Sequence, residues 1–186
     1  MELNTLLYFF STVAQVLAAI SALLAIFTQF RINEITNFLI GDGNATYVRL
    51  KDKEPGYDIL GGDHEKLLSR LRDSISRKSI LGILEVITIL AEKQIKTGPR
   101  DLNYLEKRFK ERKQLIETLK TLTKRSILFA FITILISLIG IIFVGILNDY
   151  IFLYSLFIGI TLILTICTMV LTLKGIYNVL NDMEDV

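Results

Sequence analysis

The sequence predicts an all-α integral membrane protein. It has three transmembrane helices, a helical cytoplasmic segment between the first two, and a second span continuous with a long cytoplasmic helix. Of the 186 residues, 52% are hydrophobic, and they are concentrated in long blocks. No charged residue lies in 3–30, 126–147 or 150–173. Each block meets the requirement of roughly 18–25 residues to cross a ~30 Å hydrocarbon layer. A helix is expected for each, because it satisfies its own backbone hydrogen bonds in lipid.

The basic residues predict the orientation. All but one of the 21 lysines and arginines lie between Arg31 and Arg125, and such residues are enriched on the cytoplasmic side. We therefore expect a multi-pass protein of the cell membrane, with its N-terminus outside and its C-terminus cytoplasmic. The first block lacks a basic n-region, and its apolar stretch is too long for the h-region of a signal peptide, so we expect it to be retained. An uncleaved first helix and an Ile- and Lys-rich chain suggest a prokaryotic source.

The pattern divides the chain into five segments. They are the first transmembrane helix (1–30), a turn-rich cytoplasmic linker (31–62), a cytoplasmic helical bundle or coiled-coil region (63–125), a transmembrane helical hairpin (126–173) and an acidic cytoplasmic tail (174–186).

The linker has turn signals at 41–44, Pro55-Gly56 and Gly61-Gly62. Between the first two, residues 45–50 alternate weakly and could form a short strand. The first helix could instead extend past Arg31, since Ile35, Phe38 and Leu39 share one helical face. We favour the helical extension over a hairpin.

Two further helices are expected before the second span. Asp63 is a good N-cap for a helix with an apolar face at Leu67, Leu68, Leu71 and Ile75. The apolar run 80–90 contains Glu85 and is too short to span a bilayer, so it is interpreted as buried in the core or in a subunit interface rather than re-entrant. Gly98-Pro99 is expected to end this helix.

Asp101 is expected to cap the next helix, and no helix breaker separates it from Leu147. The sequence therefore predicts one continuous helix on the order of 70 Å long. Its cytoplasmic half carries an apolar seam at Leu102, Leu105, Phe109, Ile116 and Leu119, as in a coiled coil or helical bundle.

The first span carries a face of small or polar residues, which we call the polar face. Its members fall in two adjacent rows of seven-residue spacing: Asn4, Tyr8, Ser11, Gln15, Ala18, Ala22, Ala25 and Gln29. The opposite face is expected to meet lipid and consists of Leu6, Phe10, Val13, Leu17, Ile20, Leu24 and Phe27. One interpretation is close helix packing, with Gln15 and Ser11 hydrogen-bonded across helices. The other is a water-filled path formed by several copies. The candidate pore-lining residues are Asn4, Ser11, Gln15, Ala18, Ala22 and Gln29.

The other two spans carry small residues that we interpret as helix-packing faces. They are Ala130, Thr133, Ser137 and Gly140 in the second span, and in the third Thr161, Thr165, Thr168, Thr172 and Gly175, together with Ser155 and Gly159, which are four apart. Neither face contains an ionisable side chain, which argues against a proton-coupled transporter.

Two smaller candidates remain. Asp149, at the outer turn, could form a ring of carboxylates in an oligomer, although a tight turn favours Asn-Asp for backbone reasons. Lys120, Lys124 and Arg125 lie close enough to the inner leaflet to bind anionic lipid headgroups.

Catalysis and metal binding are not expected. The single cysteine, Cys167, and the single histidine, His64, cannot form a thiolate or imidazole cluster within one chain. No nucleophile and base can be placed together, so we expect no enzyme, no cofactor, no metal and no nucleic-acid partner.

These features favour a small homo-oligomeric ion channel whose pore is lined by the first span and whose cytoplasmic helices are regulatory. Oligomers are required because three helices of one chain cannot enclose an aqueous path. The alternative is a non-conducting membrane anchor, or a regulatory or sensor subunit, whose cytoplasmic helices bind a partner.

Overall fold

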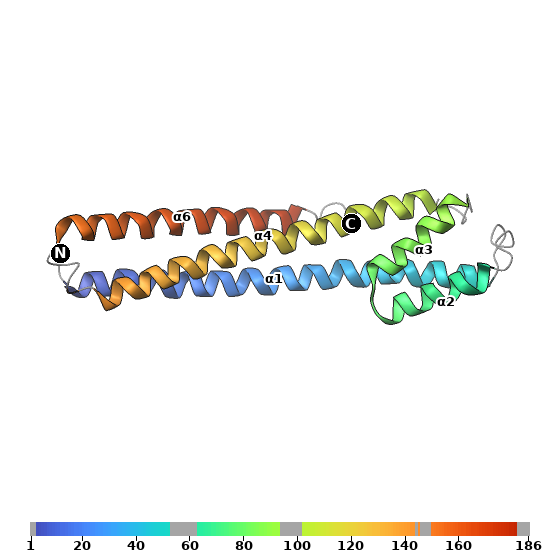
Figure 1. Cartoon of the computed structure of the whole chain (residues 1–186), viewed down its shortest axis with the longest axis horizontal. Coiled ribbons are helices and arrows are strands. Elements are labelled where there is room, and N and C mark those ends of the chain that lie inside the picture. The colour runs from blue at the N-terminus through green and yellow to red at the C-terminus, as the bar shows by residue number, and fades with distance from the viewer. Residues whose placement is uncertain (1–2, 53–62, 94–101, 144, 146–149, 182–186) are drawn as a thin grey trace. The chain divides into compact units, whose positions relative to one another are not determined.

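The computed structural model describes residues 3–52, 63–93, 102–143, 145 and 150–181. These residues form five named helices: α1 (Leu3–Lys51), α2 (Asp63–Ser76), α3 (Ile80–Glu92), α4 (Leu102–Ile142) and α6 (Ile151–Asn181) (Figure 1). The predicted all-α class is confirmed. Three helices, α1, α4 and α6, are long and apolar enough to cross a membrane, as expected of a multi-pass membrane protein.

The chain divides into two compact units. Unit 1 comprises residues 1–31 and 118–186, and unit 2 comprises residues 32–117. Helices α1 and α4 each contribute one part to each unit.

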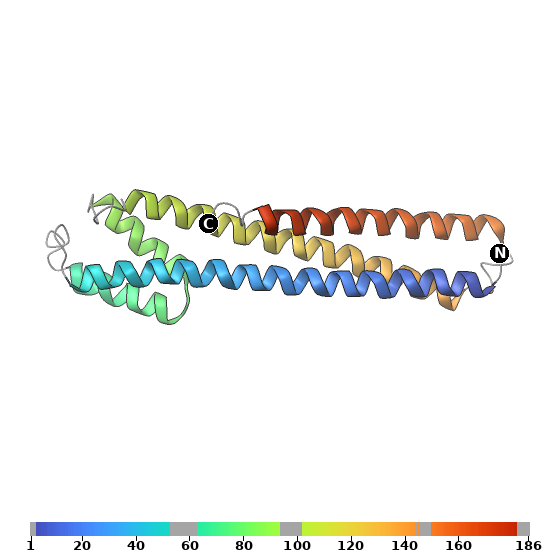
Figure 2. The same cartoon turned by 180° about the vertical axis from the view of Figure 1, so that it is seen from behind.

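In unit 1, the first part of α1 packs with α6 and the second part of α4 (Figures 1 and 2). Leu6 and Phe10 are fully buried, and the Phe10 ring meets Phe157 of α6 edge-on with 6.0 Å between ring centroids. A Cβ atom at Gly140 of α4 would lie 2.9 Å from Cζ of Phe10. Glycine therefore lets the aromatic ring approach the α4 backbone.

The predicted packing faces of α4 and α6 are confirmed except at two positions of α6: Ser155 is exposed, and a Cβ atom at Gly159 would meet nothing within 4 Å. Ala130, Thr133, Ser137 and Gly140 are buried, as are Thr161, Thr168, Thr172 and Gly175, while Thr165 is half-buried. Ser126 and Thr172 share a 2.8 Å hydrogen bond between α4 and α6. The threonines also donate to backbone carbonyls of their own helices, as Thr168 Oγ1 does to Leu164 O at 2.8 Å. Their hydroxyl groups are thus satisfied in the interior.

The face of α1 expected to meet lipid is instead largely inside unit 1. Leu6, Phe10, Leu17 and Leu24 are each at most 1% exposed, so the expectation is wrong for these four. The reason is shape. Large side chains of α1 fill the space above small residues of its neighbours, as Leu24 does at Gly175, where a Cβ atom would lie 3.3 Å from Leu24 Cδ1.

In unit 2, α1 continues without interruption to Lys51. The predicted extension past Arg31 is confirmed, whereas the turn at 41–44 and the strand at 45–50 do not form. Contacts with other helices outweigh the low helix propensity of the glycines. Gly43 packs closely against α3, since a Cβ atom at Gly43 would lie 3.1 Å from Ile83 Cγ2. Pro55-Gly56 and Gly61-Gly62 lie outside the described residues.

Helices α2 and α3 form a hairpin beside the second part of α1 (Figure 1). The reversal uses Lys78, which has a positive φ of 52°. Ser79 then caps α3, its side chain accepting a 3.2 Å hydrogen bond from the Gly82 amide.

Both helices of the hairpin agree with the sequence pattern. Helix α2 begins at Asp63, within one residue of the predicted start, and Asp63 lies in its first turn. In α3, Ile83, Val86, Ile87 and Leu90 are buried, so the interpretation of 80–90 as a buried helix is confirmed.

Helix α4 is continuous from Leu102 to Ile142, roughly 60 Å at 1.5 Å per residue. Its predicted seam is confirmed, since Leu102, Leu105, Phe109, Ile116 and Leu119 are all at most 5% exposed. Gly98-Pro99 and Asp101, expected to end α3 and cap α4, lie outside the described residues.

Candidate functional site: the polar face of α1

The polar face forms one stripe along the part of α1 in unit 1. Asn4, Tyr8, Gln15, Ala18, Ala22 and Gln29 are exposed, and Ser11 and Ala25 are half-buried. The stripe follows from helix geometry, because seven residues make nearly two turns. It lies opposite the buried Leu6, Phe10, Leu17 and Leu24.

Within one chain, α1 uses its aliphatic and aromatic side for packing and leaves the polar face exposed. The expected hydrogen bond across helices is not formed within the described part of the chain. Gln15 Nε2 instead donates to Ser11 Oγ of the same helix, one turn earlier, at 3.2 Å. By contrast, Thr28 does form a hydrogen bond between helices: its hydroxyl oxygen in α1 lies 2.8 Å from that of Thr123 in α4.

An exposed amide in an apolar helix has a physical consequence. A polar group in hydrocarbon without full hydrogen bonding costs several kcal/mol. One bond to Ser11 leaves most of the capacity of the Gln15 amide unused, since the group has two donors and a carbonyl acceptor. If α1 spans a membrane, the polar face therefore favours contact with water or with polar groups of another chain.

The remaining predicted site residues do not join this stripe. Lys120, Lys124 and Arg125 are exposed on α4, and the first two lie one helical turn apart. Asp149 lies outside the described residues. Among the residues that the structure describes, no group of three or more His, Cys, Asp or Glu side chains could hold a metal ion.

Unit 2 contains an ion pair that the sequence analysis missed. A carboxylate oxygen of Asp42 lies 3.5 Å from Nη1 of Arg108 in α4, and both side chains are mostly buried. The Arg108 guanidinium also lies 4.1 Å from the centroid of the Phe38 ring, a cation–π distance. The sequence offered one sign that Asp42 is buried, namely its spacing from other residues of α1. If α1 is helical through this region, Ile35, Leu39 and Thr46 share one face with Asp42.

Other polar contacts join the helices of unit 2. His64 Nε2 donates to the Leu50 carbonyl at 2.7 Å, joining the start of α2 to the end of α1. Glu106 of α4 accepts from Lys110 at 2.6 Å and from Thr88 of α3 at 3.1 Å. These bonds, that to Lys110 above all, lower the pKa of Glu106. A 3.0 Å bond from Lys93 likewise lowers the pKa of Asp63.

The contacts of unit 2 are structural in kind, and among its described residues (32–52, 63–93 and 102–117) they bring no reactive pair together. The polar face of α1 is therefore the strongest candidate site. The chain matches no known family model, and no curated protein or solved structure is significantly similar to it.

Proposed function

We propose that this protein is a small homo-oligomeric ion channel in which the polar face of α1 lines the pore. Several copies place their α1 helices around a common axis. Helices α4 and α6 stand behind α1 and hold it through its buried side. The 32–117 unit lies in the cytoplasm as a regulatory region, and the N-terminus lies outside.

The proposal rests on the orientation of α1 about its own axis, that is, on which of its faces packs inside unit 1. Leu6, Phe10, Leu17 and Leu24 are consumed by packing inside the chain, so Gln15 and its polar neighbours remain for an external contact. Water or polar groups in a central path satisfy these side chains at a membrane depth where lipid does not. A closed ring of identical chains is the ordinary way to provide such a path.

The proposed orientation rests on the basic residues. With the 32–117 unit in the cytoplasm, Lys120, Lys124 and Arg125 lie at the inner leaflet. There, anionic headgroups attract each charge by about 1 kcal/mol. These contacts fix the depth of α4 and, through it, the depth of α1.

The test is conductance of the purified full-length protein in a planar bilayer. We expect single-channel currents, and we expect Gln15→Leu to reduce unitary conductance because it replaces a polar lining group with an apolar one. Val16→Leu is the matched control: it changes the next residue, which is also exposed but lies about 100° round the helix, and should leave conductance unchanged. Absence of current, or a strictly monomeric protein in detergent and in lipid, contradicts the channel and favours the non-conducting anchor or regulatory subunit.

A further inference from the structure

The asparagines and glutamines of α1 all lie on one side of the helix. They are Asn4, Gln15, Gln29, Asn33, Asn37 and Asn44, and each is exposed. Each also stands two residues before a residue that is at most 3% exposed, in the same order Leu6, Leu17, Arg31, Ile35, Leu39 and Thr46. Two residues turn an α-helix by about 200°, so every amide lies away from the side of α1 that packs inside the chain. We call these six residues the amide row.

Half of the amide row lies in unit 2, beyond the uncharged block of α1. These members are Asn33, Asn37 and Asn44. At about 100° per residue, the whole row falls within about 80° of the helix circumference. Three of the four charged residues in this part of α1, Glu34, Asp42 and Arg49, fall outside that sector. The fourth, Lys51, falls inside it but belongs to the last turn of α1. Up to that turn, the sector carries hydrogen-bonding groups without a charge.

An uncharged row of amides suits contact between parallel copies of one chain. Copies that insert in a membrane in one orientation stand parallel, and rotation about a common axis places each residue level with the same residue of the other copies. A residue that faces the axis therefore meets its own copies. An acid or a base there meets a like charge, whereas an amide has both donors and an acceptor and can bond to an identical amide. Self-complementarity of this kind selects a second copy as the occupant.

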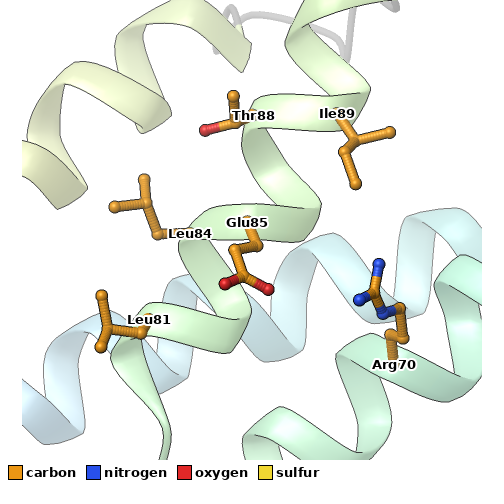
Figure 3. A pocket seen from close by; sticks show the side chains of 6 residues that line it. All are labelled: Arg70, Leu81, Leu84, Glu85, Thr88 and Ile89. Carbon is orange, nitrogen blue, oxygen red and sulfur yellow. The ribbon is translucent and has the colours of Figure 1, made fainter.

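A hollowed surface of unit 2 shows the contrast. A shallow hollow of roughly 570 Å³ on the α2–α3 hairpin is lined by Arg70, Leu81, Leu84, Glu85, Thr88 and Ile89. Figure 3 shows the Glu85 carboxylate on α3 and the Arg70 guanidinium on α2. On the axis of a parallel ring, each of these groups would meet like charges of the other copies, which is unfavourable. Of these two surfaces of unit 2, the amide row is the one that suits the axis.

We propose that the amide row in unit 2 is a contact between copies of this chain. The cytoplasmic parts of α1 stand parallel and in register, and Asn33, Asn37 and Asn44 form successive rings of amides. In parallel coiled coils, a single Asn at such a position fixes the register and the number of helices. This contact deepens the proposed function and rests on it for the parallel assembly. Because α1 is one continuous helix, the rings extend its polar lining by about 20 Å beyond Gln29.

Cross-linking of the full-length protein in lipid tests the contact. In a Cys167→Ser background, we expect Asn37→Cys and Asn44→Cys each to give dimers with a short bifunctional thiol reagent. Ala45→Cys is the matched control, because Ala45 is exposed and next to Asn44 but lies about 100° round the helix. Yields at 37 and 44 no greater than at 45 would overturn the proposal.

The register has its own test in the same background. When Asn37→Cys and Asn44→Cys chains with different tags are co-expressed, we expect few mixed dimers relative to like pairs. The two positions lie about 10 Å apart along the helix, so a shorter reagent does not join them between parallel, in-register copies. Mixed dimers as abundant as like pairs would overturn the proposal.

A charge placed in the row separates the amide contact from chance collision. With Asn37→Cys as the readout, Asn44→Asp should reduce dimer yield several-fold, because like charges then meet at one height. Asn44→Gln should keep the yield, and Ala45→Asp, which adds the same charge outside the row, should also keep it. Since Asn44 is exposed in the single chain, these changes leave the fold in place. An unchanged yield in Asn44→Asp, or an equal loss in Ala45→Asp, also overturns the proposal.

Conductance is a separate readout. Cross-linking by these rules in a protein that passes no current contradicts the channel and leaves the contact between α1 helices in place. Current through a protein that does not cross-link at 37 and 44 leaves the channel in place and overturns the cytoplasmic contact.

Discussion

Both units have apolar side chains inside, but they differ in how many hydroxyl groups they bury and in how many large apolar side chains they expose. Unit 2 has an aliphatic and aromatic interior that includes Leu39, Leu50, Leu71, Ile83, Ile87, Leu90 and Phe109. Unit 1 buries many hydroxyl groups, namely Thr28, Ser126, Thr133, Ser137, Thr161, Thr168 and Thr172, and exposes large apolar side chains such as Leu23, Phe131, Phe152, Ile163 and Leu173. The exposed apolar side chains of unit 1 are compatible with a hydrocarbon environment, in which close contact of small residues and internal hydrogen bonds hold helices together.

This contrast makes the polar face of α1 an exception in its own unit. In α4 and α6 most hydroxyl groups of unit 1 are buried against neighbouring helices, whereas Thr5 and Thr12 of α1 and Ser155 of α6 are exposed. Gln15 points outward, among residues that the rest of the chain does not cover. An outward polar face is expected of the proposed oligomer with a polar centre, whereas a simple membrane anchor has no need of one.

The largest effect is expected in unit 2, at its mostly buried ion pair. Asp42→Asn should lower the free energy of unfolding by about 3 kcal/mol, because it leaves the Arg108 charge in a mostly buried site. Thermal unfolding of the purified protein measures this change. The control is Glu111→Gln, which breaks an exposed pair with Lys107 at 3.8 Å and should cost less than about 0.5 kcal/mol. Equal costs for the two variants would show that the Asp42 pair is not effectively buried.

The next effect concerns close packing in unit 1. Gly140→Ala should destabilise the helix bundle by about 1–3 kcal/mol, because the added methyl group overlaps the buried Phe10 ring. Gly159→Ala is the control, since a Cβ atom there meets nothing within 4 Å. Melting temperatures in detergent compare the two variants. If Gly140→Ala is as stable as Gly159→Ala, α1 does not pack through Phe10 as described.

Two neighbouring glycines of α1 provide a smaller and sharper test of the contact with α3. Gly41→Ala should raise the free energy of unfolding by about 0.5–1 kcal/mol, because alanine favours a helix and a Cβ atom at this position has open space. Gly43→Ala should give no gain, because its methyl group presses on the fully buried Ile83. Equal gains in thermal stability at both positions would contradict the contact between Gly43 and α3.

The smallest effect is a pH dependence in unit 2. Because the fold lowers the pKa of Glu106 from its ordinary value of 4.5, its stabilising contribution is present above that value and lost as pH falls through the lower folded pKa. Glu106→Gln should therefore reduce the loss of melting temperature between about pH 6 and about pH 3. Identical pH profiles for the variant and the native protein would mean that the Lys110 and Thr88 contacts are not maintained in solution.

Much of the helical organisation was predictable, because uncharged blocks and apolar spacing report directly on helix length and buried faces. The orientation of α1 about its own axis was not predictable. Leucines that face lipid and leucines that fill the space above a glycine have the same hydropathy, so Leu17 and Leu24 were assigned to lipid. The predicted turn at Gly43 was wrong for a similar reason, since glycine is used both in turns and where helices make close contact. The polar face itself was visible in the sequence, but its exposure within one chain depends on how the other side of α1 packs.

Cysteine accessibility along α1 tests the central claim most directly. In a Cys167→Ser background in lipid, we predict that cysteines at Ser11 and Gln15 react with a water-soluble thiol reagent. A cysteine at Leu23 should stay protected, although Leu23 is 53% exposed in the single chain and lies only about 80° round the helix from Gln15. Protection at all three positions, or equal reaction at Leu23 and Gln15, would contradict a pore lined by the polar face of α1.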